Sequence, residues 1–353
     1  MGTENSGAIN FEVTITTSGG SRSFKQNEES PVEMIVVEEH VDMVSMATMR
    51  MSGGEEQEPW DFEIGNAVVV KIEDKTLFNG ELVSLEPVYQ VDGTTSITLR
   101  AMDKTHKLGR GRKTRFWEET KDSDVASEVG AECGLSVDAD DTSTTMPYIL
   151  QRNESNSAFL KRLAARNNFQ LRVETDLDGG SNTLVFKKAS FQGEVKELAV
   201  GEDIRSLKMS YNSADQVSKV VVRGWDIANK EEVVGEAEAG GVTTIGGGEI
   251  GAEVCKDQFG ESTAYITDVP ISSQGMATAI AEAEMERYAR QFCRGTCVLG
   301  LGDSTIQAGS MVQFDGLAQG QNGKYYVVSA RHIVSARSGY TTEIHFCSNT
   351  LGT

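Results

Sequence analysis

The sequence predicts a mainly β fold of the α+β type, in which two β-rich halves flank a smaller α+β middle. Short segments of alternating apolar and polar residues recur over the first hundred residues and again after residue 206. Between these two regions, two segments carry apolar residues at helical spacing. Many short strands at this spacing are typical of barrels or sandwiches.

The first half contains five predicted strands. In residues 10–17, Phe11, Val13 and Ile15 alternate with polar residues, as expected for a strand buried on one face. The other predicted strands cover residues 46–51, 67–73, 77–85 and 94–101, with a turn at Asp92-Gly93 before the last.

The middle region is predicted to contain two helices and a hairpin. Ser123 or Asp124 can cap the first helix, and Gly134 can end it. The second helix is predicted to begin near Ser155 or Asn156 and to end at a left-handed position at Asn167-Asn168. A hairpin with its turn at residues 178–180 follows.

The last part of the chain returns to strands. We expect strands at residues 217–225, 311–314, 324–330 and 341–346. Residues 235–251 are rich in glycine and are interpreted as a mobile loop or insertion. Residues 274–292 are predicted to form one long helix. No short internal repeat is visible.

Composition and charge exclude several classes of protein. The chain of 353 residues is 39% hydrophobic and 24% charged, which indicates a folded protein of two or three domains. A net charge of −20 disfavours general nucleic-acid binding. No apolar run is long enough to cross a bilayer, and residues 1–10 lack the apolar core of a signal peptide. We therefore expect no membrane insertion, and a protein that begins in a cytoplasm.

The sequence contains no recognisable catalytic, cofactor or metal motif. His40, His106, His332 and His345 lack the partner residues that known motifs require, and structural roles are expected for all four. The five cysteines are odd in number and scattered, which favours reduced and mostly buried thiols. They are Cys133, Cys255, Cys293, Cys297 and Cys347. The spacing of Cys293 and Cys297 also permits a metal site or a small disulfide, although no matching second pair follows.

Two further segments have both a functional and a structural interpretation. Residues 246–248 are three glycines, but they lack the strand and the Lys-Ser pair of a phosphate-binding loop, so a flexible loop is expected. A cluster of cations in this acidic chain favours a contact with an acidic neighbour over a contact with nucleic acid. The cluster consists of Lys104, Lys107, Arg110, Arg112, Lys113 and Arg115.

Several segments resemble one family, the phage late-control protein D, which also forms the N-terminal hub region of VgrG spike proteins. The segments are LFNGEL at 77–82, AMDKTHKL at 101–108, GRKTRF at 111–116, QRNESNSAFLKRLA at 151–164, VRGWD at 222–226 and GKYYVV at 323–328. The family usually has Asp where this chain has Asn156, and glycine where it has Asn167-Asn168. Both replacements preserve the expected cap and turn.

The resemblance implies two tube-like antiparallel β-barrel domains with a small α+β domain between them. The expected domains are residues 1–116, 117–200 and 201–353. The last one includes the glycine-rich insertion and the long helix. VgrG proteins continue into further spike domains, whereas this chain ends at Thr353, so the resemblance implies a hub whose spike is a separate protein.

The function implied by the resemblance is that of a structural baseplate hub in a contractile phage tail or injection system. Such a hub is a homotrimer that adapts a six-fold tail tube to a three-fold spike, with tube, spike and baseplate wedge proteins as partners. It is a component of the virion or particle, and no enzyme activity is expected. The alternatives are a tail-associated cell-wall hydrolase and a tube or tube-initiator subunit.

Overall fold

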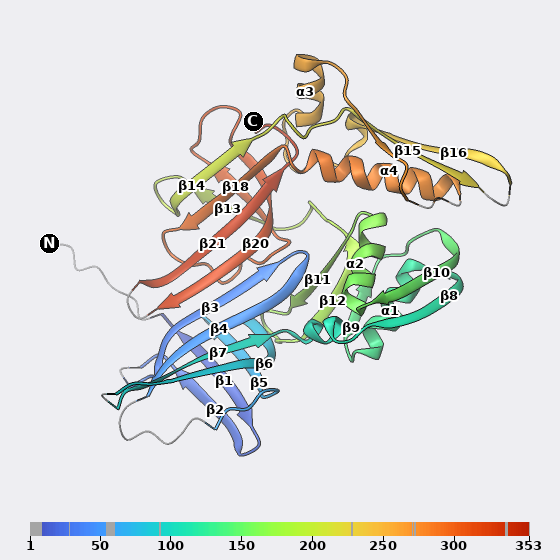
Figure 1. Cartoon of the computed structure of the whole chain (residues 1–353). Coiled ribbons are helices and arrows are strands. Elements are labelled where there is room, and N and C mark those ends of the chain that lie inside the picture. Colours follow the sequence, from blue (N-terminus) through green and yellow to red (C-terminus); the bar gives the residue numbers. More distant parts are fainter. Residues whose placement is uncertain are drawn as a thin grey trace.

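The computed structural model describes residues 9–27, 29–53, 61–91, 93–226, 229–269, 271, 273–335 and 338–352. It confirms the mainly β fold, with a helix-containing unit between two β-rich halves (Figure 1). Asp92 of the predicted turn lies outside the described residues. No helix in the described ranges is long and apolar enough to cross a membrane.

The first half consists of seven strands around one apolar core. These strands are β1 (Phe11–Thr17), β2 (Gly20–Lys25), β3 (Val32–His40), β4 (Met43–Gly53), β5 (Ala67–Ile72), β6 (Lys75–Tyr89) and β7 (Thr95–Met102). Alternation explains their burial: Val13 and Ile15 of β1 are buried, whereas Thr14 and Thr16 are not. A short 3-10 helix, η1 (Lys104–Gly109), leads out of this half.

The middle unit combines two helices with two small sheets. Its elements are β8 (Lys113–Lys121), α1 (Asp122–Glu132), β9 (Ser136–Ala139), β10 (Thr145–Glu154), α2 (Asn156–Arg166), β11 (Phe169–Thr175) and β12 (Asn182–Lys188). Strands β8 and β10 form a two-stranded ribbon, and β11, β12 and β9 form a second sheet. Because β8 spans residues 113–121, it runs across the predicted boundary at residue 116; the domain boundaries themselves stay predictions.

The two predicted helix starts have different outcomes. Helix α2 begins within the predicted range, but its cap is Ser155 and not Asn156, since the Ser155 side chain accepts a hydrogen bond from the Ala158 amide. The predicted cap of α1 at Ser123 or Asp124 is wrong, since that helix already begins at Asp122. The Ser123 amide instead donates to the Thr142 hydroxyl at 3.1 Å, which ties the start of α1 to the segment before β10.

The second half contains six strands, which are joined to a projecting segment. The strands are β13 (Val195–Ala199), β14 (Ile204–Tyr211), β18 (Cys293–Leu299), β19 (Met311–Asp315), β20 (Gly323–Ser335) and β21 (Gly339–Ser348). Between β14 and β18 lie residues 212–292, which we call the wing. It contains β15 (Lys219–Asp226), β16 (Glu231–Glu238), η2 (Ala239–Gly241), α3 (Gly251–Phe259), β17 (Thr263–Ile266) and α4 (Gln274–Ala289).

One curled sheet runs through both halves of the molecule. Its main path is β14-β18-β21-β20-β3-β4-β7-β6-β5-β1-β2, and the pairing of β20 with β3 joins the two halves. The apolar core is divided, since each half, the middle unit and the wing have separate clusters of buried side chains. In Figure 1 the blue and red strands form the curled sheet, and the wing projects from its upper end.

The glycine-rich segment 235–251 is not the mobile loop that the sequence predicted. Gly235 lies within β16, where α4 packs so closely that an added Cβ would come 2.2 Å from the Ala277 backbone. The next part is also anchored, because the Ile245 amide donates to the Asn349 side chain at 2.9 Å. A Cβ at Gly248 would come 2.2 Å from the Leu351 carbonyl oxygen. These glycines allow close packing rather than motion.

Candidate functional site

The two β halves repeat one strand order. In the first half β3 pairs with β4, β4 with β7, β7 with β6, and β6 with β5. In the second half β14 pairs with β18, β18 with β21, β21 with β20, and β20 with β19. All eight pairs are antiparallel. Strand β3 therefore corresponds to β14, and β6 corresponds to β20.

Bulges at matching positions show that the repeat extends to single residues. The β6–β7 register shifts between Leu82 and Ser84, and the β20–β21 register shifts between Val327 and Ser329. The β3–β4 register shift between Val32 and Met34 also corresponds to the β14–β18 shift between Ile204 and Ser206. Because a bulge disrupts its ladder at one defined residue, these matches align the halves without a gap across the compared strands.

Within the chain, β3 and the second part of β20 form a closed junction. Seven residue pairs, from Ser329–His40 to Ser335–Met34, lie opposite each other. Arg331 and Glu38 form an ion pair at 3.0 Å across it. Glu39 is buried next to the junction and accepts a hydrogen bond from the Ala308 amide at 3.3 Å. Burial raises the pKa of the Glu39 carboxyl to about 7.

The strands that correspond to this junction are open elsewhere in the molecule. Strand β14, the counterpart of β3, ends the sheet, and apart from one bridge between Ile204 and Val200 its outer edge has no strand partner among the described residues. Strand β6, the counterpart of β20, pairs with β5 only up to Glu81. Beyond it, Val88 and Tyr89 are 50% and 77% exposed.

These two open edges form the candidate site, and the sequence did not identify them. An unpaired strand edge can pair with another chain. Pro87 lies on the open part of β6, which fits an edge, since proline lacks a donor for a sheet ladder. The only signal in the sequence was the pair of segments Leu82-Val83-Ser84 and Val327-Val328-Ser329. Three similar residues are too few to reveal a repeat.

The four histidines lie in different parts of the molecule. His40 ends β3, His106 lies in η1, and His345 is exposed on β21. His332 is fully buried, and its ring nitrogens lie 2.9 Å from the Tyr340 hydroxyl and 3.0 Å from the Ile306 carbonyl oxygen. Burial lowers the pKa of the His332 imidazole to about 4. These contacts give His332 a structural role.

The cysteine thiols are all free in the structure. Cys293 and Cys297 lie on β18 with both side chains in the core of the second half, and burial raises the pKa of each thiol to about 12. Cys347 is also buried, whereas Cys133 and Cys255 are half-buried. Within the described ranges, no three His, Cys, Asp or Glu side chains cluster as potential metal ligands.

The basic stretch contacts acidic neighbours within the chain itself. Lys107 binds Glu81 at 2.6 Å, and Glu132 receives both Lys113 at 3.0 Å and Arg115 at 2.6 Å. The hydrogen bond from Arg115 is the largest cause of the lowered pKa of the Glu132 carboxyl. The predicted acidic neighbour is therefore the same molecule, at least for these three cations.

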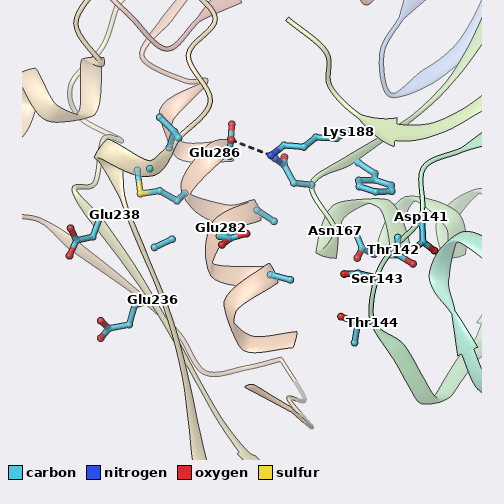
Figure 2. A pocket seen from close by; sticks show the side chains of 18 residues that line it. Asp141, Thr142, Ser143, Thr144, Asn167, Lys188, Glu236, Glu238, Glu282 and Glu286 are labelled. Atoms are coloured by element: carbon cyan, nitrogen blue, oxygen red, sulfur yellow. Dashed lines mark ion pairs between the residues drawn. The ribbon is translucent and has the colours of Figure 1, made fainter. Parts of the chain in front are cut away.

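A cleft of about 420 Å³ separates the wing from the middle unit. Figure 2 shows Glu236, Glu238 and Glu282 on the wing side, with Lys188 reaching across from the opposite side. Lys188 forms an ion pair with Glu286 at 3.8 Å, and the same carboxylate accepts a hydrogen bond from the Thr243 amide at 3.0 Å. The buried carboxylate of Glu286 thus links the wing to the middle unit.

Solved structures with the same fold include several proteins of phage tails and secretion systems. The 43 kDa tail protein of prophage MuSo2 from Shewanella oneidensis is 14% identical, with a TM-score of 0.69 over 95% of this chain and 97% of that one. The tail protein from Neisseria meningitidis MC58 is 12% identical, with a TM-score of 0.69 over 96% and 97%. At this identity the likeness establishes the fold.

A third similar structure connects this fold to an injection machine. The Escherichia coli c3393 protein is described as a component of the type VI secretion system, similar to the T4 bacteriophage tail proteins gp27 and gp5. It is 10% identical, with a TM-score of 0.64 over 95% of this chain and 76% of that one. Among proteins with curated functions, none matches the chain. The model of the Alg8 N-terminal domain matches residues 10–336, and the chain therefore belongs to the Alg8 N-terminal domain family.

Proposed function

We propose that this protein is a structural hub of a contractile tail or injection system, in which three copies form a closed ring. The ring adapts a six-fold tail tube to a three-fold spike. The observation that carries this proposal is the pair of open edges, because each is the counterpart of a strand in the closed β3–β20 junction. The fold shared with tail and secretion-system proteins supports it.

The closed junction defines the register expected between copies. Val36 lies opposite Ile333 in that junction. The matching bulges make Lys208 the counterpart of Val36 and Val88 the counterpart of Ile333. Strand β14 of one copy should therefore pair with β6 of the next, with Lys208 opposite Val88. Such a contact is heterologous, so it forms a ring when the rotation closes.

The number three follows from matching this ring to a hexameric tube. Each chain contributes two equivalent sets of strands, so three chains present six sets to the tube. Each chain contributes only one wing and one middle unit, so the same ring presents three of each. This combination suits a protein between a tube and a spike, with wedge proteins around it. The particle would assemble in a bacterial cytoplasm.

A double cysteine variant tests the ring directly. We expect chains carrying both Val88→Cys and Lys208→Cys to oxidise into a covalent trimer, because each chain supplies both halves of the contact. Denaturing electrophoresis without reductant measures the product, and light scattering should give about three times the 38.2 kDa chain mass before oxidation. The control is Lys208→Cys with Phe259→Cys, since Phe259 is 77% exposed at the end of α3 in the wing, outside both open edges.

The result can also contradict the proposal. A monomer in light scattering that forms no cross-link, even with spike protein added, would exclude the ring. Covalent products in equal amount from the control pair would mean random collision. The proposed role includes no reaction, and a peptidoglycan-clearing assay checks the hydrolase alternative: clearing by the purified chain would contradict a purely structural role.

A further inference from the structure

A second, larger cleft of about 840 Å³ lies where the two halves, the middle unit and the wing meet. Its walls come from the β3–β4 turn, α2, the start of β11, the end of α4 and the strands β18, β20 and β21. Its size lies within the range of sites that hold ligands. Figure 1 shows these elements converging beside the end of α4 that is nearest the curled sheet.

The cleft is lined by cations, in contrast to the rest of the chain. Lys161, Arg287, Arg290 and Arg294 face two carboxylates, Asp42 and Glu284, which gives four positive and two negative charges and a local net charge of +2. The whole chain has 33 Lys and Arg against 53 Asp and Glu, a net charge of −20. The net charge of the cleft lining is therefore opposite in sign to the net charge of the chain.

Three of these cations have no carboxylate partner in the part of the chain that the structure describes. Among the described residues, none lies within 4.0 Å as an ion pair for Lys161, Arg290 or Arg294. Arg290 is oriented by the Asn168 side-chain oxygen at 2.6 Å. Arg287 donates a hydrogen bond to Glu284 at 2.8 Å. This carboxylate is therefore already paired and does not neutralise the other three cations. The arrangement leaves fixed positive charge facing the cleft.

Two histidines, His40 and His345, also line the cleft, and the lowered pKa of His40 leaves that ring neutral at neutral pH. Burial lowers the pKa of the His40 imidazole, and the nearby His345 and Lys161 lower it further, whereas Asp42 opposes them. These groups on β3, β21 and α2 are therefore close enough to influence one another. The floor beneath them is apolar, with buried Tyr326 and Phe346. Tyr326 is fixed by hydrogen bonds to Gln170 at 2.6 and 2.8 Å.

We propose that this cleft binds an acidic, extended polypeptide segment of another protein of the assembly. Unpaired cations above an apolar floor match a segment that carries carboxylates between apolar side chains. A long nucleic acid fits less well, because it would extend beyond the cleft along a chain whose net charge is −20. The proposal does not depend on the ring, since every wall of the cleft belongs to one chain.

Binding of a labelled octaglutamate peptide to the full chain tests this proposal. Fluorescence anisotropy at low salt should show saturable binding by the unaltered protein. The variant carrying Lys161→Glu and Arg294→Glu should bind at least tenfold more weakly, because it removes two unpaired cations and adds two repelling carboxylates. A second variant, Lys161→Gln with Arg294→Gln, should weaken binding less and guards against misfolding of the first.

The control changes net charge equally outside the cleft. Lys104→Glu with Arg110→Glu alters two exposed cations of the basic stretch and should leave the affinity within about twofold. Equal losses in both charge-reversed variants would overturn the proposal, as would failure of the unaltered protein to bind. Tighter binding of octathymidylate than of octaglutamate would also overturn it and would identify nucleic acid as the ligand.

Discussion

The two β halves differ most in how one pair of neighbouring strands is connected. Strands β3 and β4 are joined by a turn at Val41 and Asp42, whereas their counterparts β14 and β18 are joined by the whole wing, residues 212–292. The strands on either side keep the same pairing and share one bulge, although β3–β4 has a second register shift, between Glu38 and His40, next to its turn. A sheet can therefore accept a large insertion at a strand connection without changing its order.

The halves also differ in which edge is closed. Strand β3 pairs with β20 inside the chain, whereas the outer edge of β14 is open apart from its single bridge. Next to the closed edge lies the buried carboxylate of Glu39. At the corresponding place on β14 lies Tyr211, whose hydroxyl is 3.3 Å from that of Tyr325. Of these two equivalent strands, β3 pairs within the chain, and β14 pairs, in our proposal, with the next copy.

The largest expected effect comes from breaking the proposed contact at the open edges. Val88→Lys places a cation opposite Lys208 of the neighbouring copy, and like charges directly opposite each other destabilise a strand pair. We expect the ring to dissociate to monomers at concentrations at least tenfold higher than for the unaltered protein. Sedimentation velocity over a dilution series measures this.

A compensating change sharpens this test. Adding Lys208→Glu to Val88→Lys should restore the ring, because opposite charges would then face each other. Phe259→Lys is the matched control, since Phe259 is 77% exposed at the end of α3 in the wing, outside both open edges. If the variant that carries both changes stays monomeric, the assumed register is wrong.

The buried Glu39 beside the closed edge should make the folding stability of the protein depend on pH. Because the folded-state pKa of Glu39 is raised from 4.5 to about 7, its contribution is most favourable below pH 4.5 and is lost as pH rises through 7. Glu39→Gln removes this titration and keeps an acceptor for the Ala308 amide. The variant should therefore gain relative stability between pH 5 and 8, by about 3 kcal/mol at most.

Urea unfolding at a series of pH values measures the Glu39 effect. Glu38→Gln controls for the loss of a carboxylate from the same strand. The pKa of His332 is lowered, so its contribution acts in the opposite direction and is lost as pH falls from 6.5 through 4. The contribution of His332 cancels when the stability of the variant is subtracted from that of the unaltered protein at each pH. Parallel curves for the unaltered protein and Glu39→Gln would refute the prediction.

A smaller effect distinguishes close packing from flexibility in the wing. Gly235→Ala would bring a Cβ within 2.2 Å of the Ala277 backbone, so β16 and α4 must move apart. We expect a loss of about 1–3 kcal/mol, measured by thermal unfolding. Gly241→Ala is the control, because a Cβ there meets no atom within 4 Å. Equal tolerance at both positions would restore the mobile-loop interpretation.

Local patterns predicted most elements of the fold. Apolar alternation located β1, and the pair Ser155-Asn156 before an apolar helical pattern located the start of α2, because both signals depend on near neighbours in sequence. Several elements were missed, among them strands β2, β3, β8, β10 and β18 and helix α3. Strand β2 has no buried residue, and α3 follows directly on a glycine-rich run. In both cases the local sequence carries little of the usual signal.

Neither the close packing of the wing glycines nor the candidate site at the open edges could be predicted from local patterns. Glycine lowers the expectation of order, yet Gly235 and Gly248 lie where another segment comes too close for a side chain. That segment is distant in sequence, so composition alone indicated a loop. The open edge of β6 was equally hidden, because the sequence of a strand does not say which neighbour is absent.

By itself the sequence determined the mainly β class, the helices of the middle unit and the acidic balance of the chain, since these depend on composition and on spacing over a few residues. Only the tertiary structure decided that the halves repeat one strand order, that β3 is closed where β14 is open, and that unpaired cations gather in one cleft. Each of these depends on residues brought together from distant segments, and the halves are too dissimilar in sequence for a local pattern to predict them.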